Sequence, residues 1–149
     1  MFMPASNPMP GIDAELETLI VCDAIAQSSG KYSLIGVFNR IWAAQFPCVW
    51  PALAVYLRIR LTAGKHQVQL QMIDADQQVV FSLPQAIDVN VEAADVTCEM
   101  PLNIPSLKFP APGEYWFQCL VNQRLLDNIS YQLILSHPPA PPPTAPQKD

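Results

Sequence analysis

Apolar and polar residues alternate with a period of two along most of the chain, which is the pattern of half-buried β-strands. The clearest example is 53–61, where five apolar residues occupy every second position: Leu53, Val55, Leu57, Ile59 and Leu61. A helix would scatter these side chains around its circumference, whereas a strand places all five on one face. Segment 67–72 repeats the pattern, and the connection 62–65 between the two has hairpin length and contains a glycine. We therefore predict two strands here, joined as a hairpin.

Shorter stretches of the same alternation continue in both directions along the chain. They cover residues 16–26, 32–38, 41–46, 87–91, 96–100, 115–121 and 129–135. Turn-forming residues separate them, such as Ser-Ser-Gly-Lys at 28–31, Asn-Gln at 122–123 and Asp-Asn at 127–128, which leaves 124–126 as a short piece. No ten residues keep a helical period without Pro, Gly or a β-branched cluster. About eight to ten short strands predict an all-β fold, a two-sheet antiparallel sandwich of immunoglobulin-like or C2-like type.

Composition separates this sandwich from both ends of the chain. The sequence has 149 residues, half of them hydrophobic, which suits a single domain with a buried core. We expect the β-sandwich domain to span 12–136 and the N-terminal segment 1–11 to be disordered. The tail 137–149 carries six prolines in thirteen residues and is expected to be a disordered, extended segment. It could serve as a ligand for an SH3-type groove or only as a linker.

Charge and cysteine usage narrow the class of protein. Charged residues make up 14% of the chain, the net charge is −5 and the pI is about 4.8, which argues against a nucleic-acid-binding surface. No apolar run is long enough to cross a bilayer, and the N-terminus lacks the features of a secretory signal, so we expect a cytoplasmic protein. The four cysteines (Cys22, Cys48, Cys98 and Cys119) are isolated from one another, which favours free thiols over disulfides.

Three stretches of the sequence resemble a known family. They are CDAIAQSSGKYSLIGVFNRIWAAQFP at 22–47, LAVYLRIRL at 53–61 and FPAPGEYWFQCLVNQRLL at 109–126. Together they resemble small uncharacterised bacterial β-sandwich proteins classed as a domain of unknown function, over residues 16–135. The resemblance implies a small bacterial β-sandwich and transfers no activity and no functional residues. Pro112, Gly113 and Tyr115 also resemble the penultimate strand of immunoglobulin-like domains, where the tyrosine packs at the end of the sandwich.

The residues that could support catalysis do not form a recognisable constellation. Gly30 and Lys31 lack the earlier glycine and the following Ser or Thr of a phosphate loop, so we interpret them as a turn. His66 is expected to be an exposed residue at a strand end, and His137 opens the proline tail. Cys48 is a candidate reactive thiol without a basic neighbour in sequence to lower its pKa. We therefore predict no enzyme activity, no cofactor and no metal centre.

Two further groups of residues could bind a ligand. Asp74 and Asp76 have the spacing of calcium ligands in C2-like loops, although a polar hairpin turn is the simpler interpretation. The three tryptophans could form a flat platform for carbohydrate or for a partner protein: Trp42, Trp50 and Trp116.

Tyr56, Arg58 and Arg60 lie on one side of a predicted strand. This face could receive an acidic partner, or the arginine stems could simply rest on a solvated sheet face.

Several predicted strands are uncharged on both faces, although a two-layer sandwich wets its outer faces. The examples are 19–22, 41–44 and the pair Trp116 and Leu120. Either a loop or a second subunit would cover such faces, and the low charge favours the subunit. We predict a non-enzymatic protein–protein interaction module that forms a homo-oligomer. The alternative is a sandwich that binds a small ligand, either carbohydrate or calcium.

Overall fold

The computed structural model describes residues 14–93 and 96–139, so the disorder expected for residues 1–11 and for most of the tail lies outside the described residues. Twelve strands and no helix occur in the described part, so it also contains no helix long and apolar enough to span a membrane. The strands are β1 (Ala14–Ser28), β2 (Lys31–Val37), β3 (Arg40–Trp42), β4 (Cys48–Trp50), β5 (Leu53–Leu61), β6 (Gly64–Ile73), β7 (Val79–Ser82), β8 (Ile87–Val91), β9 (Val96–Ile104), β10 (Leu107–Phe109), β11 (Gly113–Val121) and β12 (Arg124–Ser136).

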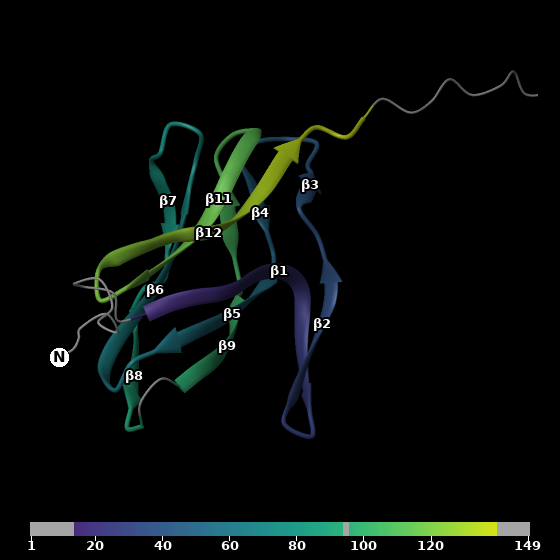
Figure 1. The fold of residues 1–149 in the computed structure, drawn as a ribbon. Coiled ribbons are helices and arrows are strands. Elements are labelled where there is room, and N and C mark those ends of the chain that lie inside the picture. The colour runs from purple at the N-terminus through teal and green to yellow at the C-terminus, as the bar shows by residue number, and fades with distance from the viewer. Residues whose placement is uncertain (1–13, 94–95, 140–149) are drawn as a thin grey trace, which may run out of the picture.

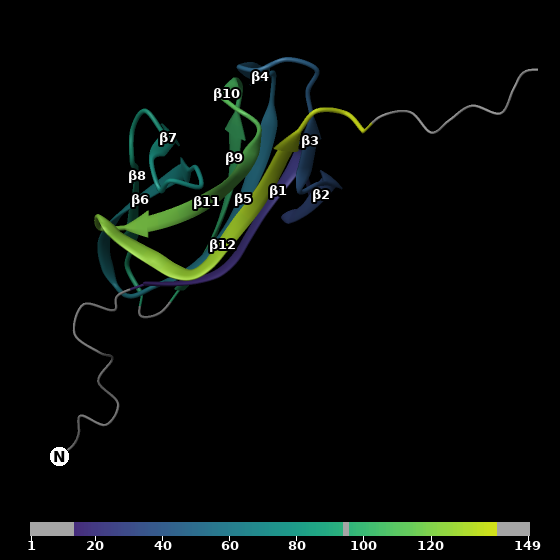
Figure 2. The same cartoon turned by 90° about the horizontal axis from the view of Figure 1, so that it is seen from above.

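Two larger sheets and one small one contain these strands. The four-stranded sheet has the order β2-β1-β5-β9 and the six-stranded sheet the order β3-β12-β11-β6-β7, with β8 also pairing with β6. β4 and β10 form a separate two-stranded sheet. Every pairing is antiparallel except β3 with β12, and β1 and β12 run side by side in both views (Figures 1 and 2). The prediction of an all-β, sandwich-like fold is confirmed, with more strands than expected because several have only three residues.

The core forms where the alternating apolar faces of the two larger sheets meet. The five residues at alternate positions of β5 are all buried, and those of β6 that face the core are Val68, Leu70 and Met72. β11 and β12 add Phe117, Cys119 and Leu133, each fully buried. The period of two therefore identified the core correctly, since these residues were chosen from the alternation alone.

The hairpin predicted between β5 and β6 is wrong. β5 lies between β1 and β9 in the four-stranded sheet, whereas β6 lies between β11 and β7 in the six-stranded sheet. The chain therefore crosses from one sheet to the other at 62–63. Alternation reports which face of a strand is buried, and two strands that face each other across a core carry the same signal as two hydrogen-bonded neighbours.

Two strand boundaries also differ from the prediction. The strand expected at 41–46 ends at Trp42, and a cis peptide bond joins Phe46 to Pro47 a few residues later. The pieces 124–126 and 129–135 belong to one strand, β12, which bulges between Leu126 and Tyr131. In this bulge the Asn128 amide donates a hydrogen bond to the backbone oxygen of Leu16 (2.9 Å), which ties β12 to β1. The turn signal at 127–128 therefore marks a bulge within a strand.

Candidate functional site

The best candidate for an interaction site lies along β2 and β3, at one side of the molecule. Ile35, Val37 and Trp42 expose 52%, 57% and 54% of their surface, and all three fall within eight consecutive residues. We call this region, residues 35–42, the apolar edge. Figures 1 and 2 show β2 and β3 next to each other, so the apolar edge joins the border of one large sheet to the border of the other.

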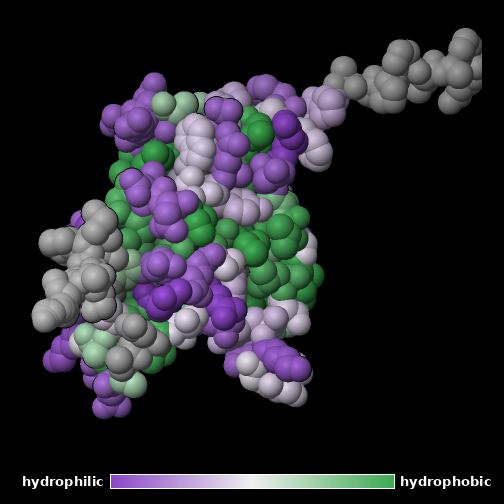
Figure 3. Space-filling view, viewed as in Figure 1, coloured by the Kyte–Doolittle hydropathy of each residue, from purple (hydrophilic) through white to green (hydrophobic). Residues whose placement is uncertain are grey.

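The backbone of β2 also presents N–H and C=O groups along the apolar edge with which a further strand can pair. β2 pairs only with β1, so one of its two sides has no neighbouring strand among the described residues. Figure 3 shows hydrophobic surface gathered on the right of the molecule, where Figure 1 places β1 and β2. Soluble proteins usually protect such an edge with charges, proline or a covering element, because its unpaired N–H and C=O groups can pair with another chain.

The β1–β2 hairpin extends from the sheet because β1 is long enough to pair with two strands in succession. Its first part pairs with β5, its last part pairs with β2, and Cys22 is the junction, opposite both Ala54 and Val37. At this junction Gly36 has a φ of +70°, and a Cβ there would overlap the carboxylate of Asp23. Glycine therefore allows β2 to approach β1 closely where the hairpin leaves the sheet.

The three tryptophans predicted as a platform lie on three different elements. Trp42 is on β3 and Trp116 on β11, with β12 between these strands, and no ring contact joins any two of the three. Trp50, on β4, packs against Phe38, the residue after β2, with a distance of 6.2 Å between ring centroids. The structure therefore does not bring the three indoles together, and Trp42 alone belongs to the apolar edge.

Tyr56, Arg58 and Arg60 do lie together, on the outer face of the four-stranded sheet. Arg58 Nε is 3.2 Å from Glu17 Oε1, and Arg60 contacts Glu17 and Glu15 at 3.2 and 3.5 Å. These pairs are about half-exposed, so each contributes only about 0.2–1 kcal/mol of stability. Chain-internal carboxylates therefore already contact both guanidinium groups, which reduces the positive charge that this face presents to an acidic partner.

The Tyr56 hydroxyl is held on the same face. It donates a hydrogen bond to the Glu99 carboxylate. Burial is the largest cause that raises the pKa of Tyr56 above its usual value, and this hydrogen bond is the second. Its ring also lies 6.0 Å from that of Tyr32, measured between centroids. Tyr56 is therefore engaged within the protein in the same way as the two arginines beside it.

His66 is buried, with 5% of its surface exposed, so the expectation of an exposed strand-end residue is wrong. It occupies the same face of β6 as Val68 and Leu70, which the alternation should have shown. The Asn122 amide nitrogen lies 3.0 Å from Nδ1, and the Thr62 backbone oxygen lies 2.8 Å from Nε2. The amide can only donate and the carbonyl can only accept, so His66 carries its proton on Nε2.

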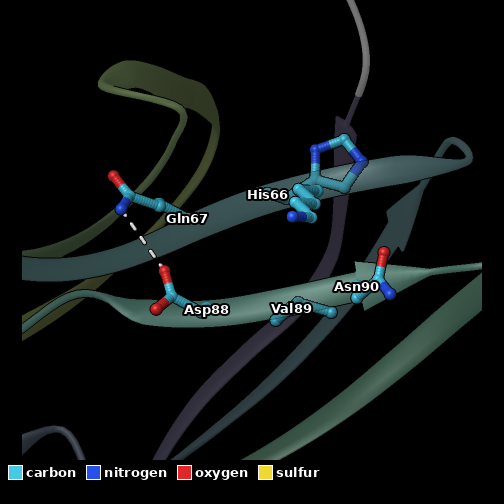
Figure 4. A pocket seen from close by; sticks show the side chains of 6 residues that line it. His66, Gln67, Asp88, Val89 and Asn90 are labelled. Carbon is cyan, nitrogen blue, oxygen red and sulfur yellow. Dashed lines mark hydrogen bonds between the residues drawn. The ribbon is translucent and has the colours of Figure 1, made fainter.

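A pocket of about 430 Å³ lies beside His66, and β6 and β8 form its walls. Figure 4 shows Gln67 and Asp88 facing each other across the two strands, with a hydrogen bond of 3.3 Å, while the His66 ring points away from Asp88. Since both nitrogens of His66 are bonded within the fold, the ring is not aligned with the acid to serve as a base. His66 and Asp88 therefore do not form an acid–base pair in this pocket.

The remaining candidates have structural roles. Asp74 Oδ1 accepts hydrogen bonds from the backbone of Asp76 and Gln78, both at 2.9 Å, and so closes the β6–β7 hairpin turn that was the simpler prediction.

Cys48 faces the interior from β4, and burial raises the pKa of its thiol. His137 packs edge-on against Phe46, with ring centroids 5.4 Å apart. In the described part no three His, Cys, Asp or Glu side chains are grouped to hold a metal.

Sequence reasoning missed Ile35 and Val37, the residues that give the apolar edge its character. The sequence predicted a strand over 32–38, but this prediction does not tell which face of the strand is covered. Only the position of β2 at the border of its sheet shows that Ile35 and Val37 remain exposed. The signal that could have indicated this is that β2 has apolar residues on both faces and one charge, at Lys31.

Comparison with known proteins identifies a family and a fold. A family model described as "Family of unknown function (DUF6941)" matches residues 17–134, and no curated protein sequence matches the chain. Among solved structures, the alkylpurine DNA glycosylase AlkC of Pseudomonas fluorescens, bound to DNA with an abasic site analog, is 15% identical with a TM-score of 0.50, covering 84% of this chain and 31% of the glycosylase. A beta-D-mannosidase of Dictyoglomus thermophilum is 14% identical with a TM-score of 0.43, covering 83% of this chain and 13% of the mannosidase. The chain thus spans less than a third of each enzyme, and the glycosylase likeness concerns the fold alone.

Proposed function

The chain belongs to this family of unknown function, which carries no assigned activity, and we propose that it is a non-enzymatic protein–protein interaction module that self-associates through the apolar edge. The observation that carries the proposal is the combination of exposed Ile35 and Val37 with the unpaired side of β2. An added strand would satisfy the backbone groups, and its side chains would cover the apolar ones.

Antiparallel pairing of β2 with β2 of a second copy supports the choice of partner. With Ile35 opposite its own symmetry mate, Ser33 falls opposite Val37 and Lys31 opposite Asn39. No like charges meet in this register, and the isoleucines form an apolar cross-strand pair at the two-fold axis. The surface is therefore self-complementary, which a symmetric dimer requires.

Two observations support the part of the proposal that the protein is not an enzyme. His66, the histidine nearest to a pocket, is bonded at both nitrogens, and the Asp74 carboxylate is occupied by the turn that it closes.

We also propose that the sandwich is of immunoglobulin-like type. This proposal is supported by Tyr115, whose hydroxyl bonds back to the backbone of Ala111, four residues upstream, as in the tyrosine corners of such domains.

Light scattering after size-exclusion chromatography tests the proposal on the full chain, whose mass is 16.5 kDa. We expect a dimer at micromolar concentration and a monomer for the double variant Ile35→Lys with Val37→Lys, because the introduced charges would face each other across the two-fold axis. The matched control is Val79→Lys, since Val79 is 54% exposed on β7, away from the apolar edge. A wild-type protein that stays monomeric at high concentration would contradict the proposal, as would a folded double variant that remains dimeric.

A further inference from the structure

The outer face of the six-stranded sheet carries an unusual row of amides. Gln67, Gln69 and Gln71 occupy alternate positions of β6, opposite to its buried side chains, and Gln118 occupies the matching face of β11. Trp116 and Leu120 flank Gln118 on the same face of β11. We call these six residues the glutamine face.

The strand register places the members of the glutamine face side by side. Trp116 pairs with Ile73 and Gln132, Gln118 with Gln71, and Leu120 with Gln69. The Gln71 amide nitrogen donates a hydrogen bond of 2.9 Å to the Gln118 amide oxygen, which holds both side chains against the sheet. The positions of these amides are thus determined before any ligand arrives, which lowers the entropic cost of binding.

Gln71 and Gln118 keep hydrogen-bonding capacity beyond this contact, whereas the Gln69 amide is bonded to the backbone of Leu70 and Leu83 and the Gln67 amide to Asp88. A glutamine amide has two N–H donors and an oxygen that accepts two bonds, and the Gln71–Gln118 bond uses one donor and one acceptor site. Among the described residues neither side chain makes a further protein hydrogen bond. Together they present donors and acceptors to the solvent next to the half-buried indole of Trp116.

A hollow of about 250 Å³ continues the glutamine face at its other end. Its lining includes Gln67, Gln69 and Leu120, together with Ala86 and Gln123. This volume is just below the about 300 Å³ at which small-molecule pockets begin, so it suits a single ring. Trp116 lies four residues from Leu120 along β11, which corresponds to about 13 Å, so one ligand must be elongated to contact both.

The chemistry of the glutamine face indicates which ligand it fits. None of the residues paired with Trp116, Gln118 or Leu120 carries a formal charge, so a phosphate or carboxylate over these three positions would find no counter-ion. The charged residues Lys65 and Asp88 lie further along, beside Gln67. Amides pair with hydroxyl groups, which also both donate and accept, and the face of an indole packs against the C–H face of a sugar ring. We propose that the glutamine face binds a neutral oligosaccharide, with one sugar on Trp116, one over Gln71 and Gln118, and one in the hollow.

This inference goes beyond the self-association proposed above and rests on other residues. A glycan array probed with the full chain, followed by calorimetric titration, tests it with neutral oligosaccharides of three or more hexoses, their monosaccharides, and anionic fragments of heparin and polygalacturonate. We expect binding of at least one neutral oligosaccharide and none of the monosaccharides or anionic fragments. Absence of binding by every neutral oligosaccharide, or equal binding of the anionic fragments, would overturn the proposal.

Variants locate the site on the glutamine face. Trp116→Ala and Gln118→Leu should each weaken the affinity for that oligosaccharide at least about tenfold, which corresponds to about 1.4 kcal/mol. Gln118→Leu replaces the amide by an apolar side chain of similar length, so it also reports the amide contribution if Trp116→Ala fails to fold. Val49→Ala is the control, because Val49 is 59% exposed on β4 and belongs neither to the glutamine face nor to the apolar edge.

Two outcomes separate this proposal from the earlier one. The Ile35→Lys, Val37→Lys variant should bind the oligosaccharide as the wild type does, even if the proposed dimer does not form. If Trp116→Ala instead changes the oligomeric state and leaves oligosaccharide binding intact, the glutamine face is a protein interface and the saccharide proposal is wrong.

Discussion

At the scale of single residues, several polar side chains are held by contacts that no local pattern indicates. The hydroxyl of Tyr115 donates to the backbone oxygen of Ala111 at 2.5 Å and accepts from its N–H at 3.2 Å. The ring is buried and packs edge-on against Phe109, with centroids 5.1 Å apart. The expectation that Tyr115 has an architectural role agrees with these contacts, since they close the turn that leads into β11.

We predict that Tyr115→Phe lowers the free energy of unfolding by about 1–2 kcal/mol, because it removes both hydrogen bonds and preserves the ring packing. Urea denaturation measures this effect. Tyr32→Phe is the control, since the Tyr32 hydroxyl makes no protein hydrogen bond in the described part of the chain, and its effect should stay within about 0.5 kcal/mol. Equal losses for the two variants would contradict this account of Tyr115.

Asn122 is the second residue whose role comes from tertiary contacts. Its side-chain oxygen accepts from the Gln67 N–H at 2.9 Å, its amide nitrogen is bonded to His66, and its φ is +53°. The sequence identified Asn122 only as a turn residue. The structure shows that it also fastens the β11–β12 turn to β6.

We therefore predict that Asn122→Ala lowers the free energy of unfolding by about 2–3 kcal/mol, because the variant loses both side-chain bonds and pays for a positive φ. Asn122→Gly tolerates the positive φ and loses only the bonds, so its loss should be about 1 kcal/mol smaller. Thermal or urea denaturation of both variants measures the two contributions. Identical stabilities would show that the turn conformation carries no cost for alanine.

At the scale of elements, the junction between β1 and β2 determines where the apolar edge lies. β1 changes partner from β5 to β2 at Cys22, and the absence of a side chain at Gly36 lets β2 pass Asp23. Gly30, at the tip of the hairpin, also has a positive φ of +74° but open space around it. The two glycines thus have similar positive φ angles but differ in the space around them.

We predict that Gly36→Ala destabilises the protein by more than Gly30→Ala, which should cost about 1 kcal/mol through its positive φ alone. The additional loss comes from the overlap of the new Cβ with Asp23, so the double variant Asp23→Ala, Gly36→Ala should recover part of it. Urea denaturation gives the three values. Equal losses at the two glycines would contradict the proposed close approach of β2 to β1.

At the scale of the whole molecule, burial of ionisable thiols and phenols makes stability depend on pH. Burial raises the pKa of Cys119 from 9.0 to about 12, and burial is also the main cause that raises the pKa values of Tyr115 and Tyr131. A raised pKa in the folded state means that the unfolded chain releases these protons first. The stability that these groups contribute is therefore complete below about pH 9 and decreases as the pH rises toward 12.

We predict that the free energy of unfolding decreases steadily between pH 9 and pH 11, with reducing agent present. Cys119→Val should flatten this decrease by up to about 1.4 kcal/mol per pH unit, because it removes one group that ionises only in the unfolded chain. Urea denaturation at half-unit steps of pH measures the slope. An unchanged slope in this variant would show that the thiol ionises equally in both states.

The sequence alone determined the properties that depend on neighbouring positions along one strand. Because side chains alternate with a period of two, it identified the core faces of β5, β6 and β11. Turn-forming residues indicated the turn at 28–31 and the polar hairpin turn at Asp74 and Asp76. The sequence could not tell which strands are neighbours, since β5 and β6 lie in different sheets and still show the alternation that a hairpin would show. For the same reason the separation of the three tryptophans and the exposure of Ile35 and Val37 were decided only by the tertiary structure. Each depends on which residues distant in the chain cover a given face, and long-range sheet pairing sets that.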